Sequence, residues 1–200
     1  MIARSLYALS ARLPCRLIQR TPGEAYLERY LLSARTGRYR YLHRFVAADM
    51  DEDLHDHPWP WAWSLVLAGG YCETWLDRID PRVPGGLVQT ERWRRAGHFH
   101  RISGEDHHRI GRCLPETWTL FCHGDWDLHR KWGFLDLQHD DITQIAVAHH
   151  RPFERQHDPG APWWESRDAC ADALEHREPF MVPGGRQDVY DDDELQGDAA

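Results

Sequence analysis

Residues 53–75 read "DLHDHPWPWAWSLVLAGGYCETW" and combine two histidines, an apolar run and a Gly-Gly pair. His55 and His57 are two positions apart, so in a strand their side chains project from one face while Asp56 projects from the other. The apolar run after them has the residue types and the length of a strand, and the Gly-Gly pair supplies the positive φ of a tight hairpin. The stretch therefore predicts a β-hairpin that begins beside two histidines sharing one face.

The period of two continues on both sides of this hairpin. Residues 38–45, "RYRYLHRF", alternate aromatic and basic side chains. Further strand candidates, separated by turn signals, are "LVQTERWRRAGHFHRI", "HHRIGRC", "ETWTLFCHG" and "RKWGFLDL". Several short strands with turns between them are typical of an antiparallel sandwich or barrel. We therefore expect an all-β barrel over residues 38–137.

The two ends of the chain depart from this pattern. An amphipathic start followed by a proline, and helical spacing in residues 21–36, predict an N-terminal helical segment over residues 1–37. Residues 138–187 mix short apolar runs with Pro, Gly and charge, and predict a C-terminal appendage with a helix starting at Ser166. The Asp-rich residues 188–200 predict a disordered tail.

Composition limits the classes of function. A hydrophobic content of 42% with 10 Trp in 200 residues predicts one folded domain with a sizeable core. The formal net charge of -8 argues against binding to a nucleic-acid backbone. The 5 cysteines show no C-x-x-C pair, and no apolar run approaches the roughly 20 residues that cross a bilayer. We expect a cytoplasmic monomer or homodimer without a nucleic-acid or membrane partner.

A metal ion held by His55 and His57 needs at least one further ligand. The stretch "GEDHHRI" offers His107 or His108, which face opposite sides of a strand because they are adjacent. We prefer His108, because Ile110 then shares its face and continues the core. The alternative for the pair of histidines is that they only begin a strand and bind nothing.

The order of these features resembles the cupin superfamily, in which H-x-H precedes a strand and a Gly turn and a later Gly turn precedes a lone His. More narrowly, "YLHRFVAADMDEDLHDHPWPWAWSLVLAGGYCE", "HRI" and "WTLFCHGDWDLHRKWGF" resemble a set of small bacterial and phage cupins. The resemblance covers residues 38–136 and implies a double-stranded β-helix, the jelly-roll barrel. It assigns His55 and His57 to the first motif, and Gly97 and His108 to the second.

The resemblance also implies a metal enzyme. The ion bound by the three histidines would be Fe(II), with Mn, Ni or Zn as alternatives. Trp61 and Ala62 stand where many cupins carry a glutamate, so the first motif supplies no fourth ligand. The set resembles thiol dioxygenases of the cysteine dioxygenase type, which implies an oxidoreductase that uses O2 on a small or peptidyl substrate. The alternatives are a non-redox isomerase, epimerase or lyase, and a barrel that binds a small ligand without catalysis.

Further residues are candidates for the surroundings of the ion. Glu73 is two residues from Tyr71 in the strand after the Gly turn, and it is a ligand, a base or a solvated residue. Tryptophans at alternate positions from residue 59 to residue 63 predict an aromatic face of the strand beside the metal. The remaining candidates are Tyr71, His98 and His100 for proton transfer, Trp59, Trp61 and Trp63 for the pocket, and Arg44, Arg101 and Arg109 for a carboxylate.

Overall fold

The computed structural model describes residues 1–19, 25–47, 53–80, 82–83, 86–139, 146–153 and 180. It contains a helix, α1 (Ile2–Ser10), and two six-stranded antiparallel sheets. Sheet A consists, in order of neighbours, of β1 (Cys15–Gln19), β2 (Ala25–Arg35), β3 (Arg38–Phe45), β10 (Thr117–His123), β5 (Trp61–Ala68) and β8 (Phe99–Ser103). Sheet B consists of β12 (Ala146–Pro152), β11 (Gly133–His139), β4 (Leu54–His55), β9 (His108–Cys113), β6 (Gly70–Ile79) and β7 (Leu87–Arg95).

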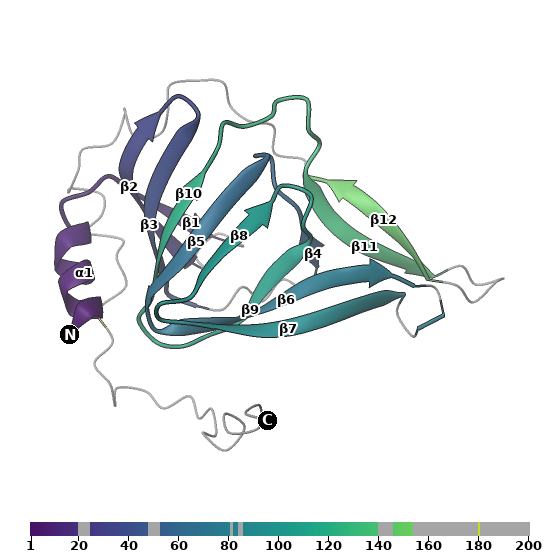
Figure 1. The fold of residues 1–200 in the computed structure, drawn as a ribbon, viewed down its shortest axis with the longest axis horizontal. Coiled ribbons are helices and arrows are strands. Elements are labelled where there is room, and N and C mark those ends of the chain that lie inside the picture. The colour runs from purple at the N-terminus through teal and green to yellow at the C-terminus, as the bar shows by residue number, and fades with distance from the viewer. Residues whose placement is uncertain are drawn as a thin grey trace, which may run out of the picture.

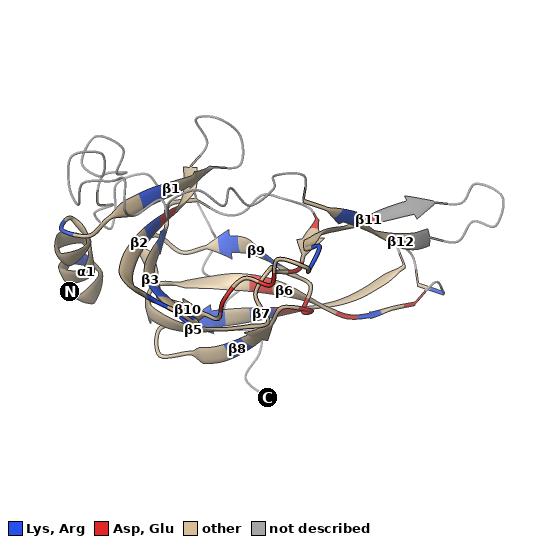
Figure 2. Ribbon diagram, turned by 90° about the horizontal axis from the view of Figure 1, so that it is seen from above, with Lys and Arg blue, Asp and Glu red and all other residues tan. Residues whose placement is uncertain are grey.

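This arrangement confirms the predicted all-β jelly roll. Neighbouring strands such as β3 and β10, or β4 and β9, are far apart in the sequence, as a chain that passes between two sheets requires. The core between the sheets contains Leu27, Phe45 and Val66 from sheet A and Tyr71 from sheet B. Figures 1 and 2 show α1 at one end of the molecule and the β11–β12 hairpin at the other.

The predicted β5–β6 hairpin is wrong, because β5 and β6 belong to different sheets. The Gly-Gly pair instead turns a corner between the two sheets, with Gly69 at φ 65°. A Cβ on Gly69 would lie 2.5 Å from the Thr117 hydroxyl, which donates to Gly70 O and accepts from Gly70 N. Gly97, at φ 88°, makes the same change of sheet between β7 and β8. Glycine is needed at both corners because other residues rarely adopt positive φ.

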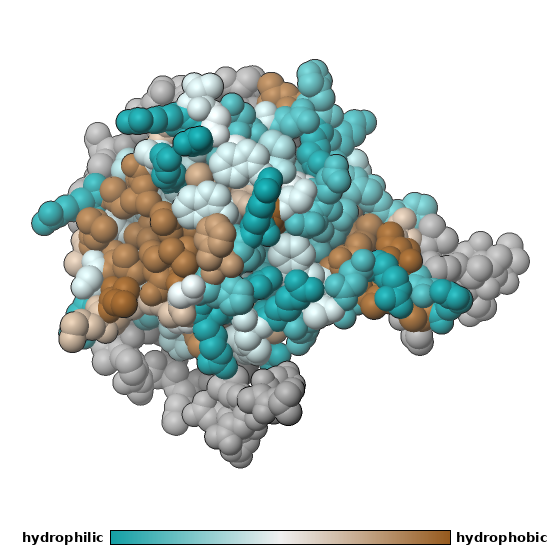
Figure 3. Space-filling model, in the orientation of Figure 1, coloured by the Kyte–Doolittle hydropathy of each residue, from teal (hydrophilic) through white to brown (hydrophobic). Residues whose placement is uncertain are grey.

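The helix α1 ends before Pro14, as predicted, and packs on the outer face of sheet A. Tyr7 of α1 lies against a buried cluster of Tyr30, Leu42 and Trp118. Sheet A is therefore buried on both faces at this end. In Figure 3 hydrophobic side chains gather over the same end of the molecule, where Ile2 of α1 is also exposed.

The helix predicted within residues 21–36 is wrong, because residues 25–35 form the strand β2. Leu27 points into the core between the sheets, while Tyr30 points outward toward α1. A strand covered on both faces carries apolar residues at odd and even positions. The resulting spacing imitates that of an amphipathic helix, so periodicity alone gives the wrong element. Because β2 pairs with β3, this segment is part of the barrel.

The C-terminal part of the barrel extends beyond residue 137. The strand β11 continues to His139 and pairs with β12, whose His150 lies opposite Leu135. The predicted helix from Ser166 and the predicted tail from residue 188 lie outside the described residues. No helix in the described part of the chain is long and apolar enough to span a membrane.

Candidate metal centre

Strand pairing brings the three predicted ligands together. The short strand β4 pairs with β9 so that His55 lies directly opposite His108. His57 follows β4 and is held by a hydrogen bond from its backbone N to Gly104 O, at 3.1 Å. One ring nitrogen from each of the three histidines lies within 4.8 Å of the others. The closest pair is Nε2 of His57 and Nε2 of His108, at 2.6 Å.

Glu73 orients His108 from behind. It lies on β6, next to β9, and its side chain is completely buried. Nδ1 of His108 donates to Glu73 Oε1 at 2.6 Å, and Arg94 Nε donates to Glu73 Oε2 at 2.8 Å. A histidine whose Nδ1–H is used in this way presents the lone pair of Nε2 to a metal. Glu73 therefore touches His108 on the side away from the other two histidines.

Burial controls the charges of these groups. Burial, reinforced by the neighbouring His108, lowers the pKa of His55 to about 3 and holds the pKa of His57 well below its usual value. Burial alone would raise the pKa of Glu73, but its polar contacts with His100 and His108 outweigh that effect and lower it. The centre therefore combines the neutral imidazoles of His55 and His57 with a carboxylate behind His108.

The donor set fits a transition-metal ion. Neutral imidazole is a good ligand for Fe, Zn, Ni and Cu, whereas Mg and Ca prefer oxygen. The two ring nitrogens 2.6 Å apart are within hydrogen-bonding distance and would separate to about 3.0–3.4 Å to bind one ion. The ligands keep some access to solvent, because His55 and His57 are only half-buried while His108 is buried. Some exposure of the ligands is what a catalytic ion requires, since it must leave positions free for a reactant.

The prediction that Trp59, Trp61 and Trp63 share one face is wrong. The strand β5 starts only at Trp61, because Pro58 and Pro60 interrupt the extended chain before it. Trp59 is buried and stacks on His57, with ring centroids 4.1 Å apart and planes at 11°. Of the three tryptophans, only Trp59 contacts the histidine cluster.

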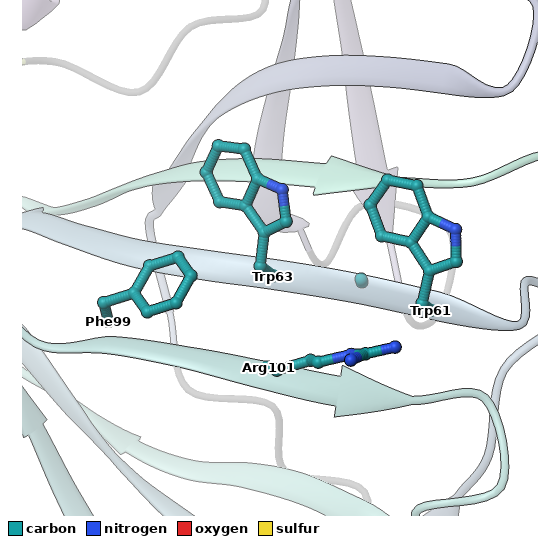
Figure 4. Close-up of a pocket in the computed structure, with 5 residues that line it drawn as sticks. Trp61, Trp63, Phe99 and Arg101 are labelled. Carbon is teal, nitrogen blue, oxygen red and sulfur yellow. The ribbon is translucent and has the colours of Figure 1, made fainter.

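Trp61 and Trp63 instead lie on the outer face of sheet A. Figure 4 shows their indoles side by side on β5, with Phe99 and Arg101 on the neighbouring strand β8. Together with Ala62 these four residues line a surface hollow of about 330 Å³. On both strands the alternate residues are buried, so the side chains around the hollow point away from the core. Trp61, Trp63 and Arg101 therefore do not face the histidines.

Two other candidates are held in contacts of their own. Arg44 is buried in ion pairs with Glu28, at 3.3 Å, and with Glu116, at 2.6 Å. Its guanidinium also lies 4.8 Å from the ring centroid of Tyr7. Tyr71 packs in the core against Phe45, and burial raises its pKa above its usual value, away from the range of a proton carrier near neutrality. The structure brings neither residue to the histidine cluster.

The remaining candidates surround the cluster at greater distance. Nε2 of His100 lies 3.6 Å from Glu73 Oε2, and Nε2 of His98 lies 3.0 Å from Arg94. Arg109 follows His108 on β9 and therefore projects from the opposite face. Sequence reasoning missed Arg94, which neutralises Glu73. The sequence "ERWRR" on β7 does not distinguish Arg94, which is buried, from the neighbouring arginines, which are exposed.

Comparison with known proteins adds only weak similarities. No family model and no curated protein matches the chain. KdgF from Halomonas sp. is 13% identical, with a TM-score of 0.40, covering 55% of this chain and 86% of that chain. A putative mannose-6-phosphate isomerase from Ralstonia eutropha JMP134 is 17% identical, with a TM-score of 0.41, covering 55% and 91%.

Hydroxypropylphosphonic acid epoxidase from S. wedmorenis is 13% identical, with a TM-score of 0.39, covering 56% of this chain and 55% of that chain. At these scores the likeness says nothing about activity. The narrower resemblance to thiol dioxygenases is not shown by these structures and stays a prediction. The jelly-roll fold rests on the order and pairing of this chain's own strands.

Proposed function

We propose that this protein is a metal-dependent oxygenase that binds one Fe(II) through His55, His57 and His108. The observation that carries the proposal is the convergence of three imidazole nitrogens within 4.8 Å at a half-buried position. Three protein ligands leave two or three positions on a five- or six-coordinate ion for reactants. When bound, Fe(II) would supply redox chemistry with O2.

The chain's own residues prepare this site. Glu73 and Arg94 fix the tautomer and the ring orientation of His108. Trp59 covers one face of His57 and so keeps water from that side of the ligands. Trp75 lies 5.1 Å from His108 between ring centroids and extends the aromatic wall. An aromatic wall beside an open coordination site favours a small or peptidyl substrate with an apolar part.

The second candidate is a non-redox isomerase, epimerase or lyase with the same ligands. It is favoured by His100, whose two ring nitrogens are buried and make no hydrogen bond within the described residues. Nε2 of His100 lies 3.6 Å from Glu73 Oε2, so the two side chains stand close enough to share a proton-transfer role. In that case the bound ion would supply only polarisation of the substrate, and Zn or Mn would serve as well as Fe.

The test is O2 uptake by protein purified anaerobically and reloaded with Fe(II), Mn(II) or Zn(II), assayed against a panel of small thiols and carboxylates. The oxygenase proposal expects substrate loss coupled to O2 uptake with Fe(II) only. Conversion without O2, supported by Zn(II) or Mn(II), would instead establish the non-redox alternative. Ligand binding without conversion under any metal would indicate a binding barrel.

A further inference from the structure

A second cluster of metal-ligand side chains lies on the other side of the same H-x-H stretch. Asp56, between His55 and His57, projects away from the three histidines and meets His107 and His150. Asp56 follows β4, His107 precedes β9 and His150 belongs to β12. One ligand atom from each lies within 4.8 Å of the other two. The cluster thus joins three segments that are far apart in the sequence.

The polar contacts of Asp56 leave one oxygen directed at the histidines. Oδ2 accepts from Arg130 at 3.0 Å. Oδ1 accepts from Gly133 N at 2.6 Å and lies 3.3 Å from Nε2 of His150. An oxygen and a nitrogen bound to one tetrahedral zinc with bonds of about 2.0 Å are separated by about 3.3 Å. The spacing between Asp56 and His150 therefore equals that of two ligands of one ion.

His107 provides the independent observation. Its Nδ1 lies 3.1 Å from Glu105 O, a carbonyl that only accepts, so this nitrogen carries the proton. Nε2 then carries a lone pair, yet it is shielded from solvent and makes no hydrogen bond within the described residues. A buried acceptor without a donor is costly. A cation between His107, His150 and Asp56 would satisfy it.

We propose that Asp56, His107 and His150 form a second metal site, for a divalent transition-metal ion such as zinc. Two imidazoles and one carboxylate match the ligand preference of zinc, with water in the fourth position. Arg130 keeps Oδ2 occupied, so Asp56 binds the ion through Oδ1 alone. The site shares no ligand with the three-histidine centre, so it stands or falls independently of the proposed oxygenase function.

The site gives β12 a link to the barrel wall. Figure 1 shows β11 and β12 projecting from one end of the molecule, beside β4. In the described residues β12 pairs with β11 alone. An ion held by His150 of β12 and by Asp56 next to β4 would join the hairpin to the barrel, so its removal would loosen β12.

The test is a zinc count. The full-length protein is stripped with a chelator, equilibrated with zinc at buffered free concentration, desalted and analysed for bound metal. We expect two zinc ions in the wild type, one in His150→Ala, one in His57→Ala and none in the double variant. His149→Ala is the matched control, because His149 is the adjacent exposed residue on the opposite face of β12.

The variants also separate failure of this site from failure of the other. Asp56→Asn and His107→Ala should each weaken binding of the second zinc at least tenfold, with the first unaffected. If only the three-histidine centre fails, the wild type binds one zinc and His150→Ala binds none. The proposal is overturned if His150→Ala and His107→Ala, shown by circular dichroism to be folded, bind as much zinc as wild type. It is equally overturned if His149→Ala loses as much zinc as His150→Ala.

Discussion

Replacing Glu73 with Gln tests how the three-histidine centre is built. The substitution keeps the shape of the side chain and removes the negative charge that faces His108 Nδ1 at 2.6 Å and Arg94 Nε at 2.8 Å. Loss of a carboxylate behind a metal-binding histidine typically lowers metal affinity about 10–100-fold, or roughly 1.4–2.7 kcal/mol. Glu73 is not itself a ligand in this structure, so the affinity should fall within that range and not vanish.

The same substitution affects folding, because Arg94 is 7% exposed and loses its charged partner. Breaking a buried ion pair costs about 3–5 kcal/mol, and the amide oxygen of Gln recovers part of this by accepting from Arg94. Metal affinity must therefore be measured on folded protein. Glu91→Gln is the matched control, since Glu91 lies on β7 with a side chain that is 61% exposed and pairs with Arg112.

The assay is competition for Co(II) against a coloured chelator at a temperature where circular dichroism shows each variant folded. Glu91→Gln should bind Co(II) as wild type does. Unchanged affinity in folded Glu73→Gln would refute the orienting role of Glu73. Complete loss of Co(II), equal to that in His108→Ala, would show that Glu73 is a ligand.

Arg44→Met should lower the free energy of unfolding, measured by urea denaturation, by about 3–5 kcal/mol, because it leaves the buried Glu28 without its cation. Arg101→Met, in the hollow on the outer face of sheet A, should change the free energy of unfolding by under about 0.5 kcal/mol. Trp59→Phe should reduce the fluorescence quenching caused by a paramagnetic ion, with Trp75 beside His108 accounting for part of what remains. Equal quenching in Trp63→Phe and Trp59→Phe would argue against the stacking on His57. Burial lowers the pKa of His123 to about 4, so the unfolded chain binds the extra proton between that value and about 6.5. Stability should therefore fall by about 2 kcal/mol from pH 7 to pH 5 through this group, and a pH dependence unchanged in His123→Gln would contradict it.

The strands and the grouping of the three histidines could be predicted because both follow from alternation. A period of two identifies β3, β5 and β10, and it places His55 and His57 on one face with Asp56 on the other. The choice of His108 over His107 also follows, since Ile110 shares its face and packs against the core. These inferences need only local geometry along one strand.

The features that could not be predicted depend on contacts between segments that are distant in the sequence. The strand β2 looks helical because α1 covers its outer face, and no pattern within β2 reveals that cover. Trp59 and Trp61 face different sides because Pro58 and Pro60 interrupt the strand between them. Alternation along a strand cannot predict how the chain turns at two prolines. Glu73 meets His108 because β6 pairs with β9, and it meets Arg94 because β6 pairs with β7. Which strands pair in a sheet cannot be read from the pattern within one strand.

The central claim is that His55, His57 and His108 hold one transition-metal ion. The most direct measurement is the metal content and Co(II) affinity of the His150→Ala protein, in which the second cluster cannot contribute. This protein is compared with two double variants, one that adds His57→Ala and a control that adds His129→Ala, since His129 is exposed. We expect about one ion per chain in His150→Ala and with the added His129→Ala, and little or none with the added His57→Ala. Full metal content and unchanged affinity after substitution of His57, and likewise of His55 and His108, would contradict the claim.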